Sequence, residues 1–99
     1  MDSMRALIFH GPGNIKVEER PIPEIGPDEV LLKVGATSVC ASDIRVYRGE
    51  KKAVQGVITG HEFAGRVAKV GEDVAGIAVG DRTIVCPIIA CGACYYCQI

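Results

Sequence analysis

A cysteine and a histidine, Cys40 and His61, each lie in a short polar segment that also carries a carboxylate. Cys40 begins the segment Cys-Ala-Ser-Asp, and His61 is the centre of Gly-His-Glu. Thiolate sulfur and imidazole nitrogen are ligands that zinc uses at sites where one coordination position stays open for chemistry. A neighbouring carboxylate can fix the tautomer and orientation of a ligand histidine. Cys40 and His61 are therefore predicted zinc ligands, with Asp43 and Glu62 beside them.

Three more cysteines, Cys91, Cys94 and Cys97, follow one another with two residues between each pair. This close spacing predicts a zinc site, because one loop can then wrap around a tetrahedral ion. The alternative is three free thiols in a surface loop. Five cysteines without a secretory signal favour metal binding over disulfides, and an odd number cannot pair completely. The remaining cysteine of this region, Cys86, is expected to be a buried strand residue.

The elements that must position these residues are short strands and turns. Val, Ile, Leu and Ala dominate the apolar residues, and 12 glycines and five prolines punctuate the chain. The expected strands are 5–9, its hairpin partner around 15–17, 29–39, 62–70 and 82–89. A short helix capped by Ser42 or Asp43 is expected to run to Gly49. The predicted fold is all-β, a partly open barrel with one short helix.

Two segments have a predicted backbone role. Residues 20–28 contain three prolines, which cannot donate to a sheet ladder, so this segment is expected to be an extended connector. Gly65 interrupts the expected strand 62–70, and a glycine there indicates that another backbone approaches closely.

Size and charge exclude several classes of function. Ninety-nine residues form one domain at most, and 48% hydrophobic with 23% charged residues indicates a folded globular chain. A net charge of −1 provides no basic field for nucleic acid or anionic lipid. The N-terminus lacks the layout of a signal peptide, and no apolar run reaches the roughly 20 residues of a membrane span. We therefore expect a cytoplasmic protein without nucleic-acid or membrane partners.

The order of the motifs resembles the N-terminal part of the zinc-dependent medium-chain alcohol and polyol dehydrogenases, which have a GroES-like catalytic domain. The motifs that carry this resemblance are Arg-Pro-Ile-Pro at 20–23, Gly-Pro-Asp-Glu-Val at 26–30, Cys-Ala-Ser-Asp at 40–43, Gly-His-Glu at 60–62, Gly-Asp-Arg at 80–82 and the cysteine segment at 91–97. They cover nearly the whole chain, and their shared order is more specific than any one of them. The resemblance implies that residues 1–99 are the N-terminal part of a GroES-like catalytic domain.

The resemblance also implies a role for each matched residue. Cys40 resembles the first ligand of the catalytic zinc and His61 the second, while the family's third ligand, a Cys or Glu, is expected beyond residue 99. Glu62 resembles the acid beside the metal, which acts as a ligand or supports one. Asp43 resembles the carboxylate that orients His61, and Ser42 the hydroxyl next to the substrate oxygen. The structural zinc ligands of the family match Cys91, Cys94 and Cys97, with a fourth cysteine further on.

The implied activity is oxidation of a secondary alcohol or polyol, by hydride transfer from a zinc-bound alkoxide to NAD or NADP. Zinc can lower the pKa of a bound hydroxyl, and Ser42 would pass the proton outward. No Gly-x-Gly-x-x-Gly follows a predicted strand, so the Rossmann cofactor domain is expected to be absent from this chain. The chain alone, with both zinc sites incomplete, is expected to be an inactive fragment of a homo-oligomeric enzyme.

Two residues depart from the family pattern. Arg45 stands where many members have a histidine that completes the proton relay, and a guanidinium stays protonated, so it cannot accept the proton. Ala41 stands where some members carry a side chain that touches the cofactor.

Two other hypotheses compete with a dehydrogenase. One is a non-enzymatic β-barrel module similar to the co-chaperonin GroES, and the other is a free-standing zinc-binding or redox-sensing fragment. The fold alone fits all three, because fold does not determine function. Cys40, Ser42, Asp43 and His61 favour the dehydrogenase, because a chaperonin cap has no use for metal ligands.

Overall fold

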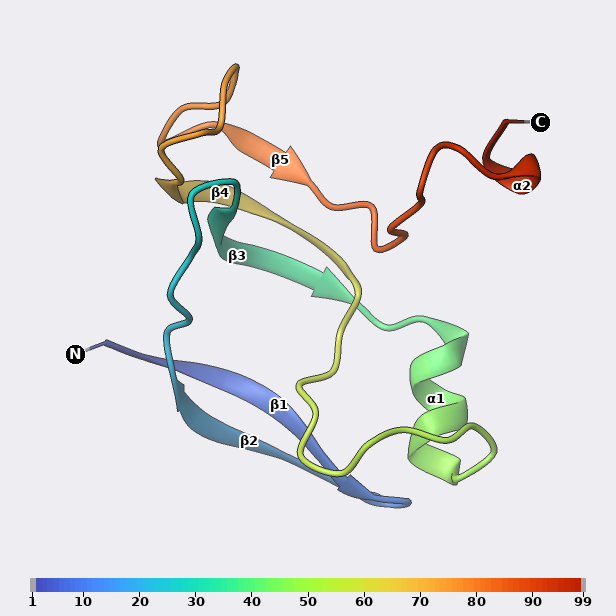
Figure 1. The fold of residues 1–99 in the computed structure, drawn as a ribbon. Helices are drawn as coiled ribbons and strands as arrows, with labels where there is room; N and C mark the ends of the chain where they lie inside the picture. Colours follow the sequence, from blue (N-terminus) through green and yellow to red (C-terminus); the bar gives the residue numbers. More distant parts are fainter. Residues whose placement is uncertain (1, 99) are drawn as a thin grey trace.

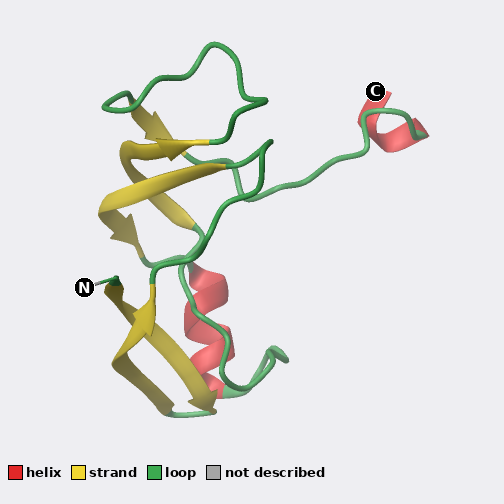
Figure 2. Ribbon diagram, turned by 60° about the vertical axis from the view of Figure 1, so that its left-hand side comes forward, coloured by secondary structure: helices red, strands yellow, loops and turns green. Residues whose placement is uncertain are grey.

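The computed structural model of the protein describes residues 2–98, which form two antiparallel sheets and two short helices (Figures 1 and 2). The elements are β1 (Ser3–Gly11), β2 (Asn14–Pro21), β3 (Val30–Ser38), α1 (Ala41–Arg48), β4 (Glu62–Val70), β5 (Arg82–Ile84) and α2 (Tyr95–Gln98). β1 and β2 form a hairpin, and the second sheet has the order β3-β4-β5. The predicted mainly-β class is confirmed, but both sheets are open and do not close into a barrel.

Four sequence predictions about the elements are wrong. The segment 20–28 is not wholly a connector, because Arg20 and Pro21 belong to β2, where Pro21 ends the strand. A second short helix, α2, is present where only one helix was expected. The last strand ends at Ile84 rather than Ile89; one more backbone hydrogen bond follows, from Val85 N–H to the Phe63 carbonyl at 3.2 Å, and Pro87 then offers no donor. The N-cap of α1 is Cys40, whose extended backbone precedes the helix, rather than Ser42 or Asp43.

Most of the small core lies on the hairpin strand β1, where Ala6, Ile8 and Phe9 are buried, and Val67 of β4 is the other buried apolar residue of the described part. The segment 56–59 runs along this strand (Figure 1), with hydrogen bonds from Phe9 N–H to the Val57 carbonyl at 3.0 Å and from Gly56 N–H to the Phe9 carbonyl at 2.7 Å. Apolar burial and these backbone bonds together fix the path of the chain that leads into His61.

Helix α1 is held against the turn of the hairpin at its C-terminal end. Gly13 N–H donates to the Tyr47 carbonyl at 2.6 Å, which satisfies one of the carbonyls left free at a helix end. Gly49 ends the helix in the left-handed conformation, with φ of 80°, and a Cβ there would lie 3.1 Å from Pro12. The hairpin therefore fixes the position of α1.

Strands β3 and β4 run antiparallel over their whole length, with register partners from Val30 opposite Val70 to Ser38 opposite Glu62. Gly65 lies where the two backbones meet most closely, because a Cβ on it would stand 2.2 Å from the Lys33 carbonyl oxygen. The predicted close backbone approach at Gly65 is confirmed. A glycine is required there by space, since its φ is not in the left-handed region.

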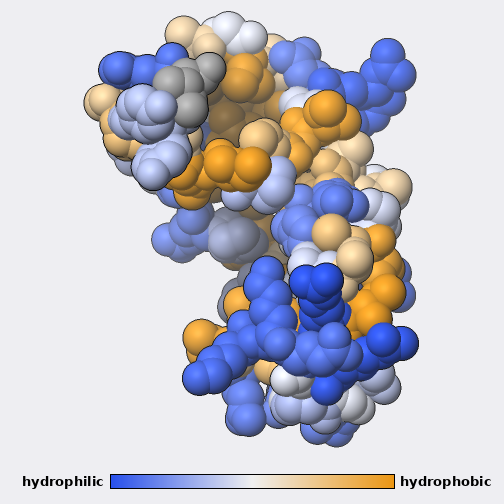
Figure 3. All heavy atoms as spheres, turned by 90° about the vertical axis from the view of Figure 1, so that its right-hand side faces the viewer, coloured by the Kyte–Doolittle hydropathy of each residue, from blue (hydrophilic) through white to orange (hydrophobic). Residues whose placement is uncertain are grey.

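Many apolar side chains of the described residues reach the surface, including Ile84, Ile88 and Ile89. Figure 3 shows such side chains mostly in the upper half of one face, above a largely hydrophilic lower half. Neither helix within residues 2–98 has the length and apolar character needed to cross a membrane.

We expect Gly65→Ala to destabilise the protein by about 1–3 kcal/mol, because the new methyl group meets a strand backbone that cannot move aside freely. Gly35→Ala in the facing strand is the matched control, since its Cβ would meet nothing closer than the Ala64 carbonyl oxygen at 3.8 Å. Urea unfolding midpoints measure both variants. Equal midpoints for the two alanine variants would contradict the close contact at Gly65.

Candidate metal centre

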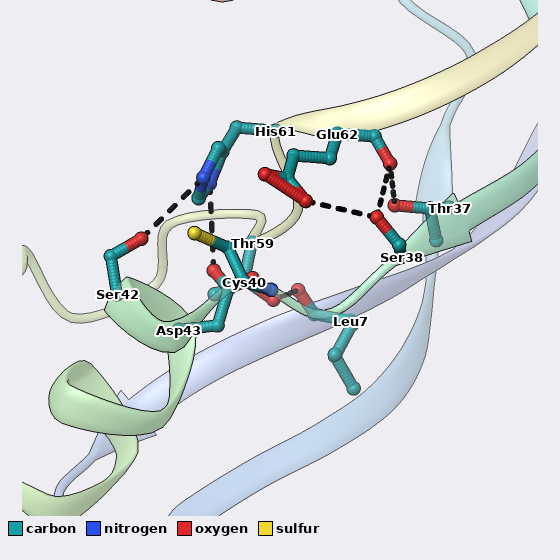
Figure 4. Close-up of polar contacts among 9 residues, drawn as sticks. All are labelled: Leu7, Thr37, Ser38, Cys40, Ser42, Asp43, Thr59, His61 and Glu62. Atoms are coloured by element: carbon teal, nitrogen blue, oxygen red, sulfur yellow. Dashed lines mark hydrogen bonds and ion pairs between the residues drawn. The ribbon is translucent and has the colours of Figure 1, made fainter.

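The ends of three elements meet at the candidate site (Figure 4). Cys40 lies between the end of β3 and the start of α1, and His61 directly precedes β4. Because Ser38 at the end of β3 pairs with Glu62 at the start of β4, the two short segments that follow and precede them are neighbours. One ligand atom each from Cys40, His61 and Glu62 lies within 4.8 Å of the other two.

Asp43 serves both the helix and the histidine. Its Oδ2 accepts a hydrogen bond from the Cys40 backbone N–H at 2.9 Å, which is the capping contact at the start of α1. Its Oδ1 lies 3.6 Å from His61 Nδ1, too long for a hydrogen bond but close enough to attract a protonated ring. The structure therefore places Asp43 beside the ring nitrogen that faces away from Ser42.

Ser42 contacts the other ring nitrogen of the same histidine. Its Oγ lies 3.4 Å from His61 Nε2, and both side chains are partly exposed. With Nδ1 beside Asp43, Nε2 is the nitrogen left to bind an ion, and the Ser42 hydroxyl lies next to that position. Ala41 and Arg45, the two departures from the family pattern, are exposed on α1.

Glu62 is held by hydroxyls that the sequence did not indicate. Ser38 Oγ donates to Glu62 Oε1 at 3.0 Å, and Thr37 Oγ1 donates to the Glu62 backbone carbonyl at 3.1 Å. These contacts follow from the register of β3 against β4, which places Ser38 opposite Glu62. Two irregularities shift that register, between Leu31 and Leu32 and between Val34 and Ala36. The sequence alone therefore does not predict which residues of the two strands are partners.

The side chains around Cys40 and His61 favour their charged forms. The Ser42 hydroxyl and backbone N–H next to the sulfur, and then His61, lower the pKa of the Cys40 thiol. Cys40, followed by the attraction of Asp43, raises the pKa of the His61 ring. A metal ion binds the thiolate and a neutral imidazole nitrogen, so the lowered pKa of Cys40 favours ion binding and the raised pKa of His61 opposes it.

The donor set fits zinc. One thiolate sulfur, one imidazole nitrogen and one carboxylate oxygen are all donor types that zinc binds in proteins. An open groove of about 490 Å³ adjoins these donors and is lined by His61, Glu62 and apolar residues that include Phe63 and Ile84. The groove provides space for a small molecule beside the donors.

The second cluster joins α2 to the segment before it, because Cys91 and Cys94 precede this helix and Cys97 lies within it. Ligand atoms of Cys91, Cys94 and Cys97 lie within 4.8 Å of one another, with Cys97 Sγ 3.7 Å from Cys91 Sγ and 3.5 Å from Cys94 Sγ. Backbone N–H groups of Ala93 and Cys94 point at Cys91 and lower the pKa of its thiol to about 7. Cys86 is exposed and follows β5, so the prediction that it is a buried strand residue is wrong.

The alcohol dehydrogenase GroES-like domain family matches residues 26–99. The chain belongs to this family. It corresponds to the N-terminal part of a zinc-dependent medium-chain dehydrogenase, as the resemblance in the sequence indicated.

Similar proteins are dehydrogenases. Zinc-type alcohol dehydrogenase B from Aspergillus flavus is 41% identical over 98 residues, which cover 98% of this chain and 23% of that protein. Sorbitol dehydrogenase from Bacillus subtilis strain 168 is 41% identical over 100 residues, which cover 97% of this chain and 28% of that protein. A structure assigned to a zinc-binding dehydrogenase from Sinorhizobium meliloti 1021, bound to NADP, matches with a TM-score of 0.88 and 41% identity. The match covers 99% of this chain and 29% of that one. These relatives favour the dehydrogenase hypothesis over a non-enzymatic module.

The chain therefore spans about a quarter of the length of these relatives. The described part contains two donor clusters. Zinc is in the name of the Aspergillus flavus relative, and NADP is bound in the Sinorhizobium meliloti structure.

We expect Cys91 of the metal-free protein to react with iodoacetamide at a rate that is half-maximal near pH 7, because the thiolate is the reactive form and its pKa is about 7. In urea, the loss of the Ala93 and Cys94 N–H contacts should move that midpoint up to about 8.5. Mass spectrometry of the alkylated peptides measures the rate at Cys91 alone. A midpoint that is the same in the folded and the urea-unfolded protein would contradict these contacts.

Proposed function

We propose that this chain contributes the metal-binding part of a zinc- and NAD(P)-dependent dehydrogenase that oxidises a secondary alcohol or a polyol. Residues 1–99 form the N-terminal part of its GroES-like catalytic domain. The observation that carries the proposal is the convergence of Cys40, His61 and Glu62 donor atoms within 4.8 Å, in a chain of this family. The printed name of the sorbitol dehydrogenase relative supports a polyol among the candidate substrates.

Cys40 and His61 hold the catalytic zinc in this proposal, and Glu62 supplies an oxygen donor. When bound, zinc acts as a Lewis acid that makes a substrate hydroxyl easier to deprotonate. Asp43 keeps the ring of His61 turned so that Nδ1 faces the carboxylate and Nε2 lies beside Ser42. A carboxylate in this place orients a ligand histidine and strengthens it as a ligand.

Ser42 relays the proton of the substrate hydroxyl: its Oγ takes that proton while its own hydroxyl proton leaves to water. Its Oγ lies beside His61 Nε2 and is partly exposed, so it has access both to the donor cluster and to solvent. Arg45 cannot take the proton onward because a guanidinium remains protonated. The proton that leaves Ser42 therefore goes to water, without a histidine at position 45 as an intermediate carrier.

Cys91, Cys94 and Cys97 hold a structural zinc in this proposal. Their sulfurs already lie close together, and the N–H contacts to Cys91 stabilise its thiolate, which is the form a zinc ligand takes. The nicotinamide cofactor binds on a part of the enzyme outside the described residues, consistent with the absence of a dinucleotide-binding glycine motif within them.

We expect Cys40→Ser in the full-length enzyme to remove about one zinc per chain and to lower kcat/KM at least 100-fold, because Lewis-acid catalysis contributes several kcal/mol. Cys86→Ser is the matched control, since Cys86 is exposed and belongs to neither cluster. Metal analysis and alcohol-dependent NAD(P) reduction provide the measurements. Unchanged zinc content and activity in Cys40→Ser would remove Cys40 from the site.

We expect Ser42→Ala to lower kcat about 100-fold while zinc content stays at the wild-type level, because positioned proton transfer contributes factors of this size. Ser42→Thr keeps the hydroxyl and should retain most of the activity. If the alanine variant turns over as fast as the threonine variant, Ser42 does not carry the proton.

A further inference from the structure

The carboxylate of Glu62 is anchored by a serine to which the proposed function gives no role. Ser38 Oγ donates to Glu62 Oε1 at 3.0 Å and also lies 3.5 Å from the Glu62 backbone carbonyl oxygen (Figure 4). Ser38 is the last residue of β3 and Glu62 the first residue of β4, and the two are register partners. The contact therefore joins the two strand ends that border the donor cluster.

Glu62 needs such an anchor because its side chain is exposed. A glutamate at a strand end has several rotamers, and most of them would turn the carboxylate toward solvent or the open groove. A hydrogen bond to a carboxylate is among the stronger ones a hydroxyl makes, so it selects the rotamer that lies beside Cys40 and His61.

We propose that Ser38 is a positioning residue that keeps the Glu62 carboxylate at the metal site as its oxygen donor. The hydroxyl binds Oε1, and the hydrogen bonds that Glu62 accepts end on Oε1 and on its backbone carbonyl. The other carboxylate oxygen is thereby left to face Cys40 and His61. This inference rests on the proposed function and specifies how its oxygen donor Glu62 is held.

The neighbouring residue provides a matched control. Thr37 also bonds Glu62, but Thr37 Oγ1 donates only to the backbone carbonyl, at 3.1 Å. Thr37→Val therefore removes a hydroxyl from the same strand end without touching the carboxylate. Ser38→Thr keeps the hydroxyl on a residue type well suited to a strand.

The test is a titration of metal-free full-length protein with Co²⁺. Binding is monitored by the near-ultraviolet absorption of the sulfur-to-cobalt charge-transfer band. Both cysteine-containing clusters can contribute to this absorption. The part that is lost in the Cys40→Ser variant comes from the site at Cys40 and His61. For that part, Ser38→Ala should weaken the Co²⁺ affinity about tenfold, in line with losses of neighbours that orient a ligand. Ser38→Thr and Thr37→Val should stay close to wild type.

A double-mutant cycle separates positioning from general destabilisation. Glu62→Gln should itself weaken Co²⁺ about tenfold, and Ser38→Ala in that background should add nothing further. Wild-type affinity in Ser38→Ala, or an equal loss with and without Glu62, overturns the role of Ser38 but leaves the proposed function intact. If Cys40→Ser removes no absorption at all, the proposed function fails together with the inference. If Ser38→Ala does not fold, the other two variants provide the test. Wild-type Co²⁺ affinity in Ser38→Thr together with weakened Co²⁺ affinity in Glu62→Gln supports the positioning role of Ser38. Any other combination contradicts it.

Discussion

The antiparallel register between β3 and β4 is the constraint on which the candidate site depends. It sets Ser38 opposite Glu62 at one end of the strand pair, so the residues just outside the strands, Cys40 and His61, lie side by side. A slip of one residue would turn every following side chain to the other face and separate these donors. Gly65 helps to exclude such a slip, because the Lys33 carbonyl fits only against a residue without a side chain.

Polar contacts at the two ends of helix α1, rather than a large core, position the remaining residues of the site. Asp43 bonds the start of α1 and faces His61, so a single carboxylate links the local fold of the helix to the orientation of the histidine. At the other end, Gly13 bonds the Tyr47 carbonyl and attaches the helix to the hairpin. The hairpin thus supports the site although none of its residues is among the candidate ligands.

The parts of this account that the sequence could predict are those with a local signal. Cys40 and His61 stand in short motifs with chemically suited neighbours, and Gly65 interrupts an otherwise regular strand pattern. The role of Ser38 has no local signal, because it follows from a strand register that two irregularities shift. The exposure of Cys86 has no local signal, because the strand-forming residues Thr83, Ile84 and Val85 precede it, while the strand itself ends at position 84. Local chemistry was readable, whereas strand ends and cross-strand partners depend on the tertiary fold.

The central claim, that Cys40 and His61 share one metal ion, is tested most directly by anomalous diffraction at the zinc edge from crystals of the purified full-length protein. We expect a peak about 2.3 Å from the Cys40 sulfur and about 2.0–2.1 Å from a His61 ring nitrogen. An anomalous map with a peak at Cys91, Cys94 and Cys97 but none between Cys40 and His61 would contradict it.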